Sequence, residues 1–212
     1  MDTAEITIPV ISTTGNISGM QFPSIEDYNQ WDLYKNRIIC LDGEIEDWDY
    51  HIVKDIIHFN IADYGIESEK RIPIILLINS CGGLLNISNS IIDAITISKT
   101  PVWTVNMGEA LSGGCLIFLA GEKRFTTPNS WCMVHAGSGG IAGNYNETKE
   151  QSKVWDTQVK NLGNWVISRT GIDTKTYNKY KNKDWWLTCS QQLEFGFATK
   201  QIESIDEIMR VV

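Results

Sequence analysis

Residues 107–121 read MGEALSGGCLIFLAG, in which small residues surround one serine, Ser112, and a wholly apolar run follows. Gly113 and Gly114 come directly after the serine. A structural turn would explain the glycines but not the apolar run, which is typical of a helix buried on every side. The stretch therefore predicts that Ser112 lies where a strand ends and a buried helix begins.

The flanking sequence alternates between strand and helix patterns. Four runs are typical of strands: residues 37–41, 72–79, 102–107 and 131–135. Apolar residues recur at helical spacing in residues 47–62 and 84–98, and Asp42-Gly43 predicts a turn that closes the first strand. This alternation indicates βαβ units around a mostly parallel sheet, an α/β fold whose strand-to-helix turns share one end and commonly build the site.

The second half of the chain predicts one long helix, residues 147–170, ending at Gly171 as a C-cap. Its apolar stripe consists of Trp155, Val159, Leu162 and Val166. Such a stripe fits a helix packed on its own core and equally a helix that docks against a partner subunit. Thr188 to Gln191 matches a capping box, which predicts a further helix through Phe195.

Composition restricts the class of protein. The chain has 212 residues, 42% of them hydrophobic and 21% charged, which is enough for a sizeable core. Residues 1–29 are expected to form a flexible or partner-dependent arm, and residues 30–212 a single domain. The net charge of −8 argues against binding to nucleic acid or to an anionic membrane through a general field.

The sequence also predicts a cytoplasmic protein. No basic and apolar leader and no apolar run of about 18 residues is present, so neither a secretory signal nor a membrane span is expected. The five cysteines form no C-x-x-C pair, which favours reduced thiols over a zinc site or a disulfide framework. The one basic cluster, residues 174–183, is expected to be a solvated helix face.

Ser112 is a candidate nucleophile because of its predicted place. A helix start leaves free backbone N–H groups and a partial positive charge, which stabilise an oxyanion when a serine attacks a carbonyl. Gly113 would let a substrate approach the backbone, and Gly82-Gly83 in the preceding βα turn could add a second donor. The structural alternative is that Ser112 is only a helix N-cap, and the G-x-S-x-G pattern is absent because Ala110 takes the first glycine position.

His135 is the candidate base among three histidines. It closes the strand WCMVH, at an element end where a side chain can face a site. His51 and His58 lie on one predicted helix with Asp55 between them, and they are expected to be helix-surface residues rather than metal ligands.

A third residue must orient the imidazole. Of the acids that follow His135, Asp156 falls on the long helix and Asp173 is typical of an N-cap, so Asp184 and Asp206 remain. Asp184 precedes Trp185 and two further apolar residues, which predicts that it is drawn toward an apolar interior.

Specific motifs carry a family resemblance. The segments RIICLDGEIED, INSCGG, MGEALSGG, AGEKRFTTPNS, MVH and KDWWLTCSQQLEFGF make the chain from about Tyr28 to Ile208 similar to ClpP, the self-compartmentalising serine peptidase of the bacterial Clp system. The resemblance implies a crotonase-like spiral of βαβ units with a protruding handle made of a strand and a long helix, here residues 137–170. It implies no metal and no cofactor, since only a partner ATPase would use ATP.

The resemblance also assigns roles by position. It implies that Ser112 is the nucleophile, His135 the base and Asp184 the orienting acid. The oxyanion donors would be the backbone N–H groups of Gly83 and Gly113. An extended substrate peptide would add as a strand beside Gly139, Gly140 and Ile141. The implied function is endopeptidase hydrolysis of unfolded polypeptides through an acyl-enzyme, inside a chamber of heptameric rings, single or stacked in pairs, that a Clp-type ATPase unfoldase feeds.

Several positions depart from the family pattern. Cys81 and Gly137 stand where the family has prolines, and Ile75 and Leu77 stand where it has docking aromatics. Lys183 replaces an arginine of the ring-to-ring contact, and lysine cannot make a bidentate guanidinium contact. These departures, together with a divergent N-terminal arm, indicate a divergent member of the family. A phage or a mobile element could encode such a protein. A capsid-maturation protease, a weak or inactive scaffold subunit, and a crotonase acting on acyl-CoA are the alternative functions.

Overall fold

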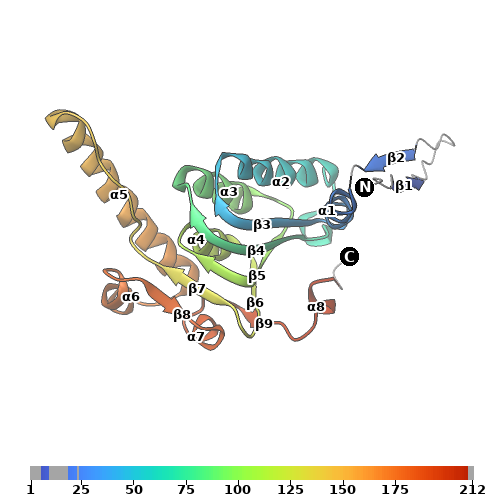
Figure 1. Cartoon of the computed structure of the whole chain (residues 1–212). Helices are drawn as coiled ribbons and strands as arrows, with labels where there is room; N and C mark the ends of the chain where they lie inside the picture. Colours follow the sequence, from blue (N-terminus) through green and yellow to red (C-terminus); the bar gives the residue numbers. More distant parts are fainter. Residues whose placement is uncertain (1–5, 10–18, 23, 210–212) are drawn as a thin grey trace. The chain divides into compact units, whose positions relative to one another are not determined.

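The computed structural model describes residues 6–9, 19–22 and 24–209. The chain divides into two compact units, Met1–Ile38 and Ile39–Val212 (Figure 1). The predicted arm of residues 1–29 falls partly outside the described residues, and its flexibility stays a prediction.

The first unit contains a helix that has no apolar signal in the sequence. Strand β1 (Ile6–Pro9) pairs antiparallel with β2 (Gly19–Phe22), and α1 (Ile25–Lys35) follows. Ser24 caps α1 by accepting a hydrogen bond from the backbone N of Asp27. No residue of α1 is buried, and a helix without a buried face needs no apolar stripe. The predicted arm boundary at residue 29 falls inside this helix.

The second unit is built on a seven-stranded sheet. Its strands are β3 (Ile38–Ile45), β4 (Ile74–Gly83), β5 (Val102–Leu111), β6 (Lys123–Thr126), β7 (Trp131–Val134), β8 (Trp185–Leu187) and β9 (Lys200–Gln201). The order is β3-β4-β5-β6-β9, while β7 pairs with the far end of β5 and with β8. The pairs β4–β5, β5–β6, β5–β7 and β6–β9 are parallel, and β7–β8 is antiparallel. The predicted α/β fold with a mostly parallel sheet is therefore confirmed.

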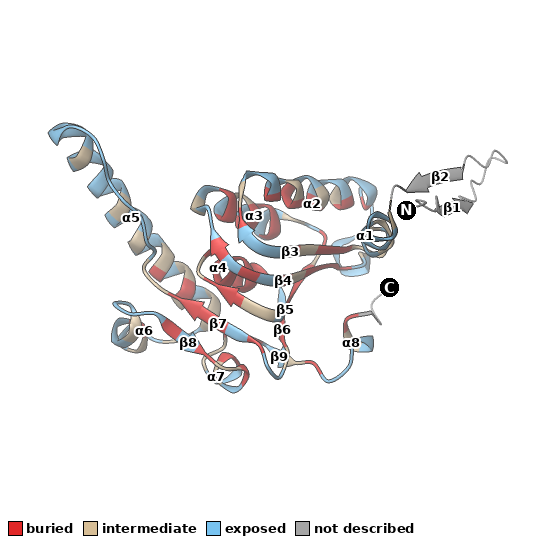
Figure 2. Ribbon diagram, in the orientation of Figure 1, coloured by how far each residue is buried: buried red, intermediate tan, exposed pale blue. Residues whose placement is uncertain are grey.

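Helices fill the connections between the strands. They are η1 (Asp47–Tyr50), α2 (His51–Ala62), η2 (Ser68–Lys70), α3 (Leu85–Ile97), α4 (Gly113–Ala120), α5 (Tyr145–Thr170), α6 (Thr174–Tyr180), α7 (Cys189–Glu194) and α8 (Asp206–Met209). All eight residues of α4 are buried, as the apolar run predicted (Figure 2). Thr188 forms the predicted capping box of α7, and Asp173 caps α6. The lysines of residues 174–183 are exposed, as expected of a solvated face.

Three strands are longer than the apolar segments from which they were predicted. β4 continues through Gly83, β5 continues through Leu111, and β3 passes through the predicted turn at Asp42-Gly43. Gly43 has φ +79°, a conformation that glycine adopts without steric cost, and the strand continues through it. The predicted turn was wrong, because backbone pairing continues where the side chains become polar and exposed.

The long helix α5 is half packed and half exposed. Asn144 caps its start, and Gly171 ends it with φ +75°, as predicted. Near its C-terminus Trp165 Nε1 donates to the carbonyl of Leu116 at 3.2 Å. Figure 1 shows that its N-terminal half projects away from the sheet of this unit, and Figure 2 shows that half to be largely exposed. Residues 136–144 before α5 form a loop, so the strand expected in the handle is not formed in this structure.

A buried amide fixes the strands that carry the candidate site. Gln192 of α7 is fully buried, and its Nε2 donates to the carbonyls of Ser130 and Leu187, at 3.2 and 3.4 Å. Its Oε1 accepts from Thr126 Oγ1 at 2.8 Å and from Asn106 Nδ2 at 3.3 Å. This one side chain therefore connects β5, β6 and β8 with Ser130, the residue directly before β7.

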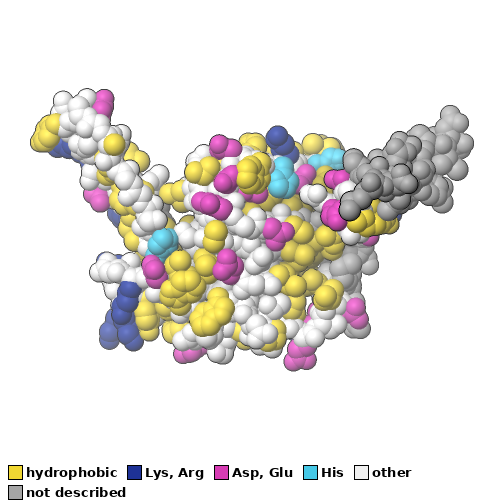
Figure 3. All heavy atoms as spheres, viewed as in Figure 1, with side chains coloured by type: hydrophobic (Ala, Val, Ile, Leu, Met, Phe, Trp, Pro, Cys, Tyr) yellow, Lys and Arg dark blue, Asp and Glu magenta, His cyan; other side chains and the backbone are white. Residues whose placement is uncertain are grey.

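Apolar side chains reach the surface beside the same strands. Figure 3 shows hydrophobic side chains gathered over β7 and β8. Trp131 and Trp186 lie there, each about half exposed, with their rings in an edge contact at 6.4 Å between centroids. A contiguous exposed patch of this kind is typical of a surface that contacts another chain.

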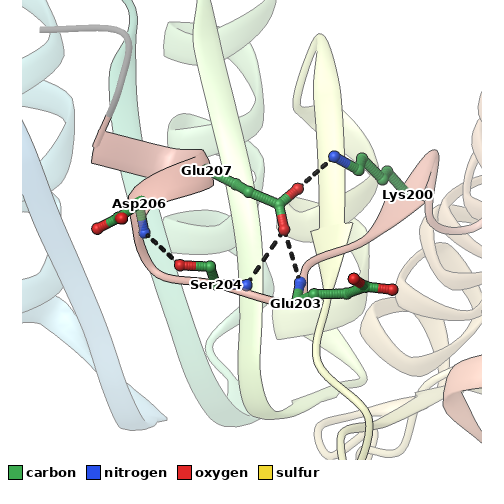
Figure 4. A network of polar contacts seen from close by, with 5 residues as sticks. All are labelled: Lys200, Glu203, Ser204, Asp206 and Glu207. Atoms are coloured by element: carbon green, nitrogen blue, oxygen red, sulfur yellow. Dashed lines mark hydrogen bonds and ion pairs between the residues drawn. The ribbon is translucent and has the colours of Figure 1, made fainter.

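The C-terminal segment is held by a small polar network (Figure 4). Glu207 pairs with Lys200, and it accepts hydrogen bonds from the backbone N atoms of Glu203 at 2.8 Å and Ser204 at 3.1 Å. Ser204 Oγ in turn accepts from the backbone N of Asp206 at 3.2 Å. Glu207 thus connects α8 to β9.

Candidate active site

Ser112 occupies a strained junction between β5 and α4. Its backbone has φ +52° and ψ −119°, and Arg37 is the other non-glycine residue with positive φ in the described part of the chain. Its N–H donates to the carbonyl of Met133 on β7 at 2.8 Å, and its carbonyl accepts from the N–H of Leu116 at 3.2 Å. Strain of this kind costs about 1–3 kcal/mol and persists where the surroundings enforce it. The predicted position of Ser112 at this junction agrees with the structure.

His135 meets Ser112 directly. The Oγ of Ser112 lies 2.7 Å from Nε2 of His135, within hydrogen-bonding distance. His135 follows β7, and its side chain is 19% exposed. Because β7 pairs with the end of β5, the register brings two residues 23 positions apart in sequence into contact.

Asp184 lies near His135 but is not buried. Its Oδ1 is 3.6 Å from Nδ1 of His135, an ion-pair distance longer than a hydrogen bond, and its side chain is 61% exposed. The expected apolar interior was wrong, because side chains alternate along a strand. Trp185 and Leu187 of β8 point inward, whereas Asp184 shares the outward side with Trp186. Asp206, the other acid that the spacing left open, lies in α8.

The two candidate oxyanion glycines flank this pair. Gly113 opens α4, and Gly83 ends β4 with φ +153°. A Cβ on Gly83 would lie 2.3 Å from the carbonyl O of Ile45, and a Cβ on Gly82 would lie 2.9 Å from the backbone N of Gly113. Gly83 therefore packs on the end of β3 and Gly82 on the start of α4, which explains why glycines are needed there.

A cavity of about 710 Å³ opens at these residues. Ser112, His135, Gly83 and Gly113 line it. Its other walls come from α3 and α5, and they include Asn89, Ile92, Asp93, Trp155, Leu162 and Trp165. The sequence assigned the α5 stripe to a core or a partner contact. The structure shows that Trp155 and Leu162 line the cavity, and their i, i+7 spacing was the only signal.

The three residues expected to pair with a substrate lie outside the cavity wall. Gly139, Gly140 and Ile141 are exposed, in the loop before α5. The Cα of Gly139 packs so closely on the ring of Trp155 that a Cβ there would lie 3.0 Å from it. Their role in binding stays a prediction.

His51, His58 and Asp55 of the described chain do not form a group that could hold a metal ion. His51 Nδ1 contacts the carbonyl of Trp48 at 3.0 Å, and His58 is exposed on α2. Burial raises the pKa of the neighbouring Asp55, while the two histidines act in the opposite direction. Within residues 6–9, 19–22 and 24–209, no three His, Cys, Asp or Glu side chains are grouped so that they could hold a metal ion. In the same residues, no helix combines the length and apolarity required to span a membrane.

Comparisons with known proteins identify the family. The family model for Clp protease matches residues 24–205. The chain is 31% identical over 172 residues to the ATP-dependent Clp protease proteolytic subunit 2 of Treponema pallidum, covering 80% of this chain and 83% of that protein. A solved structure of a ClpP1 mutant from Listeria monocytogenes superposes with a TM-score of 0.71 at 26% identity, covering 85% of this chain and 99% of that one.

These matches and the α/β spiral define a Clp-type peptidase fold. The chain belongs to the Clp protease family, and a protease-like function follows from that membership.

Proposed function

We propose that this protein is a serine endopeptidase that hydrolyses peptide bonds of unfolded polypeptides. The single observation that carries the proposal is the 2.7 Å contact between Ser112 Oγ and His135 Nε2 at the wall of a 710 Å³ cavity. A hydroxyl at this distance can transfer its proton to a neutral imidazole as it attacks a carbonyl.

The reaction follows from this arrangement in two stages. First, Ser112 attacks the scissile carbonyl, His135 takes the hydroxyl proton, and the N–H groups of Gly83 and Gly113 stabilise the oxyanion. The protonated imidazole then gives the proton to the leaving amine, which leaves an acyl-enzyme. In the second stage His135 activates a water molecule that releases the acyl group. The proposed chemistry requires no metal and no cofactor.

Asp184 is proposed to orient His135 and to stabilise its protonated form. At 3.6 Å and with a 61% exposed side chain, it acts through an ion pair rather than a buried hydrogen bond. The same observation favours a second candidate function, a catalytically weak ClpP-like scaffold subunit, because a screened carboxylate supports an imidazolium less than a buried one does.

The proposal includes assembly into a ring. The exposed Trp131 and Trp186 patch supports self-association, and the Treponema relative is named as an ATP-dependent proteolytic subunit. The ring would be heptameric and cytoplasmic, single or stacked, and a Clp-type ATPase would supply unfolded chains. Ile75 is buried at a position where the family resemblance implies a docking aromatic, so the ATPase contact would differ in detail.

A fluorophosphonate probe tests the proposal, because it reacts preferentially with an activated serine. The wild-type protein is expected to be labelled on the peptide that contains Ser112, and Ser112→Ala is expected to abolish labelling. Native mass spectrometry of the same samples reports whether both variants form the same particle. Unlabelled wild-type protein in an intact ring would contradict the peptidase and support the scaffold.

A further inference from the structure

Two cysteines lie in contact behind the proposed site. The Sγ atoms of Cys115 and Cys132 are 3.0 Å apart, about 1 Å longer than a disulfide bond. Both side chains are fully buried, and the S–H of Cys132 points to Cys115. The proposed mechanism uses neither thiol.

The pair joins the two segments that carry the nucleophile and the base. Cys115 lies in the first turn of α4, three residues after Ser112, and Cys132 lies on β7, three residues before His135. The same segments are already connected by the hydrogen bond from the N–H of Ser112 to the carbonyl of Met133. A covalent bond between the two sulfurs would therefore constrain the segments that set the Ser112–His135 distance.

We propose that Cys115 and Cys132 form a reversible disulfide that switches off the Ser112–His135 site. The inference rests on the proposed serine peptidase function. Closing the sulfurs by about 1 Å displaces α4 against β7, and a displacement of about 1 Å between reacting groups costs on the order of 10²-fold in rate.

The oxidation is a two-electron step with a small peroxide as oxidant. One sulfur, as its thiolate, attacks a peroxide oxygen; the O–O bond breaks, and a sulfenic acid and one water form after proton transfer. The second sulfur attacks the sulfenic sulfur; the S–O bond breaks, the S–S bond forms and a second water leaves. Two thiols and one H₂O₂ thus give one disulfide and two waters, and a dithiol reductant reverses the step.

The environment explains why the pair rests in the reduced state. Burial raises the pKa of the Cys132 thiol well above its usual value, and the hydrogen bond to Cys115 acts in the same direction. The Cys132 thiol is therefore protonated at neutral pH and reacts slowly. Leu116 and Met133, the sequence neighbours of the two cysteines, line the cavity, which is the route by which a small peroxide would approach the pair.

The test treats the assembled wild-type protein with H₂O₂ and removes the peroxide with catalase. The unfolded chains are then blocked with N-ethylmaleimide and digested without reduction. Mass spectrometry is expected to show the Cys115 and Cys132 peptides joined, two hydrogen masses below their sum. Fluorophosphonate labelling is expected to fall by about 10²-fold and to return with dithiothreitol.

Matched variants separate the switch from other oxidation. Cys132→Val should form no linked peptide and keep its labelling after peroxide, and Cys115→Ala is the second variant if the first fails to fold. Cys189→Ser removes another buried thiol, which contacts Gln201 instead, and should respond like wild type.

Three results would count against the inference. It is overturned if no linked peptide forms under conditions that oxidise the exposed Cys81, or if the linked peptide forms without loss of labelling. It is also overturned if Cys132→Val loses its labelling at the same dose. Absence of labelling in the untreated, reduced protein would contradict the proposed function instead, and the linked peptide would still decide whether the disulfide site exists.

Discussion

At the scale of single residues, backbone conformation and side-chain chemistry act together around Ser112. Ser112 has a positive φ, and its hydroxyl lies within hydrogen-bonding distance of His135. Because Gly82 has no side chain, the end of β4 can approach the start of α4 closely. A serine with neighbouring glycines before an apolar run was enough to predict the junction. The contact with His135 depends on the pairing of β7 with the end of β5, which no local pattern in the sequence encodes.

Gly83→Ala tests the tight approach of the β4 turn. Its φ of +153° and the 2.3 Å clash with the carbonyl of Ile45 leave no room for a methyl group, so the turn must shift and take its N–H with it. Loss of one oxyanion donor is expected to lower the labelling rate by about 10²-fold or more. The measurement is the rate of fluorophosphonate labelling.

Gly43→Ala is the matched control for that substitution. Gly43 has φ +79°, but no atom lies within 4 Å of the position that an alanine Cβ would take. Gly43→Ala should therefore lower the free energy of unfolding by about 1–2 kcal/mol through backbone strain. Its rate of fluorophosphonate labelling should equal that of wild type. Labelling of Gly83→Ala at the wild-type rate would show that the N–H of this turn does not act on the oxyanion.

The exposure of Asp184 shows how far local reasoning reaches. The apolar residues after it suggested burial, but the alternation of β8 decided the direction of each side chain. The family resemblance named Asp184 ahead of Asp206, and the structure places it 3.6 Å from the imidazole. Its role in orienting His135 stays a prediction.

At the scale of elements, apolar periodicity predicted the helices and the interior strands well. It failed where pairing rather than side-chain burial defines an element. The ends of β3, β4 and β5 are polar or glycine-rich yet stay in the sheet, and α1 carries no apolar stripe. The short β8 and β9 depend on neighbours distant in sequence, so no local pattern could have predicted them.

Glu207→Gln tests the network that connects α8 to β9 (Figure 4). The hydrogen bond with Lys200 and those from the backbone N atoms of Glu203 and Ser204 lower the pKa of Glu207. A lowered carboxyl pKa contributes stability that is present above the unfolded-state pKa and lost as the pH falls through the folded-state pKa. Hydrogen exchange in residues 200–208, corrected for intrinsic rates, should therefore be faster in Glu207→Gln than in wild type at pH 7, and the difference should vanish in acid.

Glu203→Gln is the control for this effect. The network in Figure 4 uses the backbone N of Glu203 but not its carboxylate, so the variant should exchange like wild type at both pH values. A pH-independent difference for Glu207→Gln would show that its charge does not hold α8.

At the scale of the whole molecule, the property that matters most for a member of this family is its assembly with other chains. The motifs from about Tyr28 to Ile208 pointed to the family that the comparisons then identified. Exposed apolar side chains such as Ile97, Trp131 and Trp186 are numerous enough to favour contact with other chains. The sequence could not determine how many chains associate, because that depends on how surfaces match rather than on local patterns.

Lys183→Arg tests whether rings stack. If Lys183 lies in a ring-to-ring contact, arginine can form the bidentate contact that lysine cannot, and the fraction of stacked rings should rise. Lys181→Arg, an exposed position two residues earlier, should leave the distribution unchanged. Native mass spectrometry measures both, and a wild-type protein that is monomeric at all concentrations would rule out the chamber.

The central claim is that Ser112 and His135 act as one reactive pair, and a peptidyl chloromethyl ketone tests it most directly. Leucine next to the reactive group suits the apolar wall formed by Ile92, Leu116 and Leu162. We predict that the serine adds to the ketone while Nε2 of His135 is alkylated, so that peptide mapping places the inhibitor on His135. Ser112→Ala should slow this alkylation by about 10²-fold or more. Alkylation of Cys81 with His135 unmodified, or equal alkylation of His135 in wild type and Ser112→Ala, would contradict the claim.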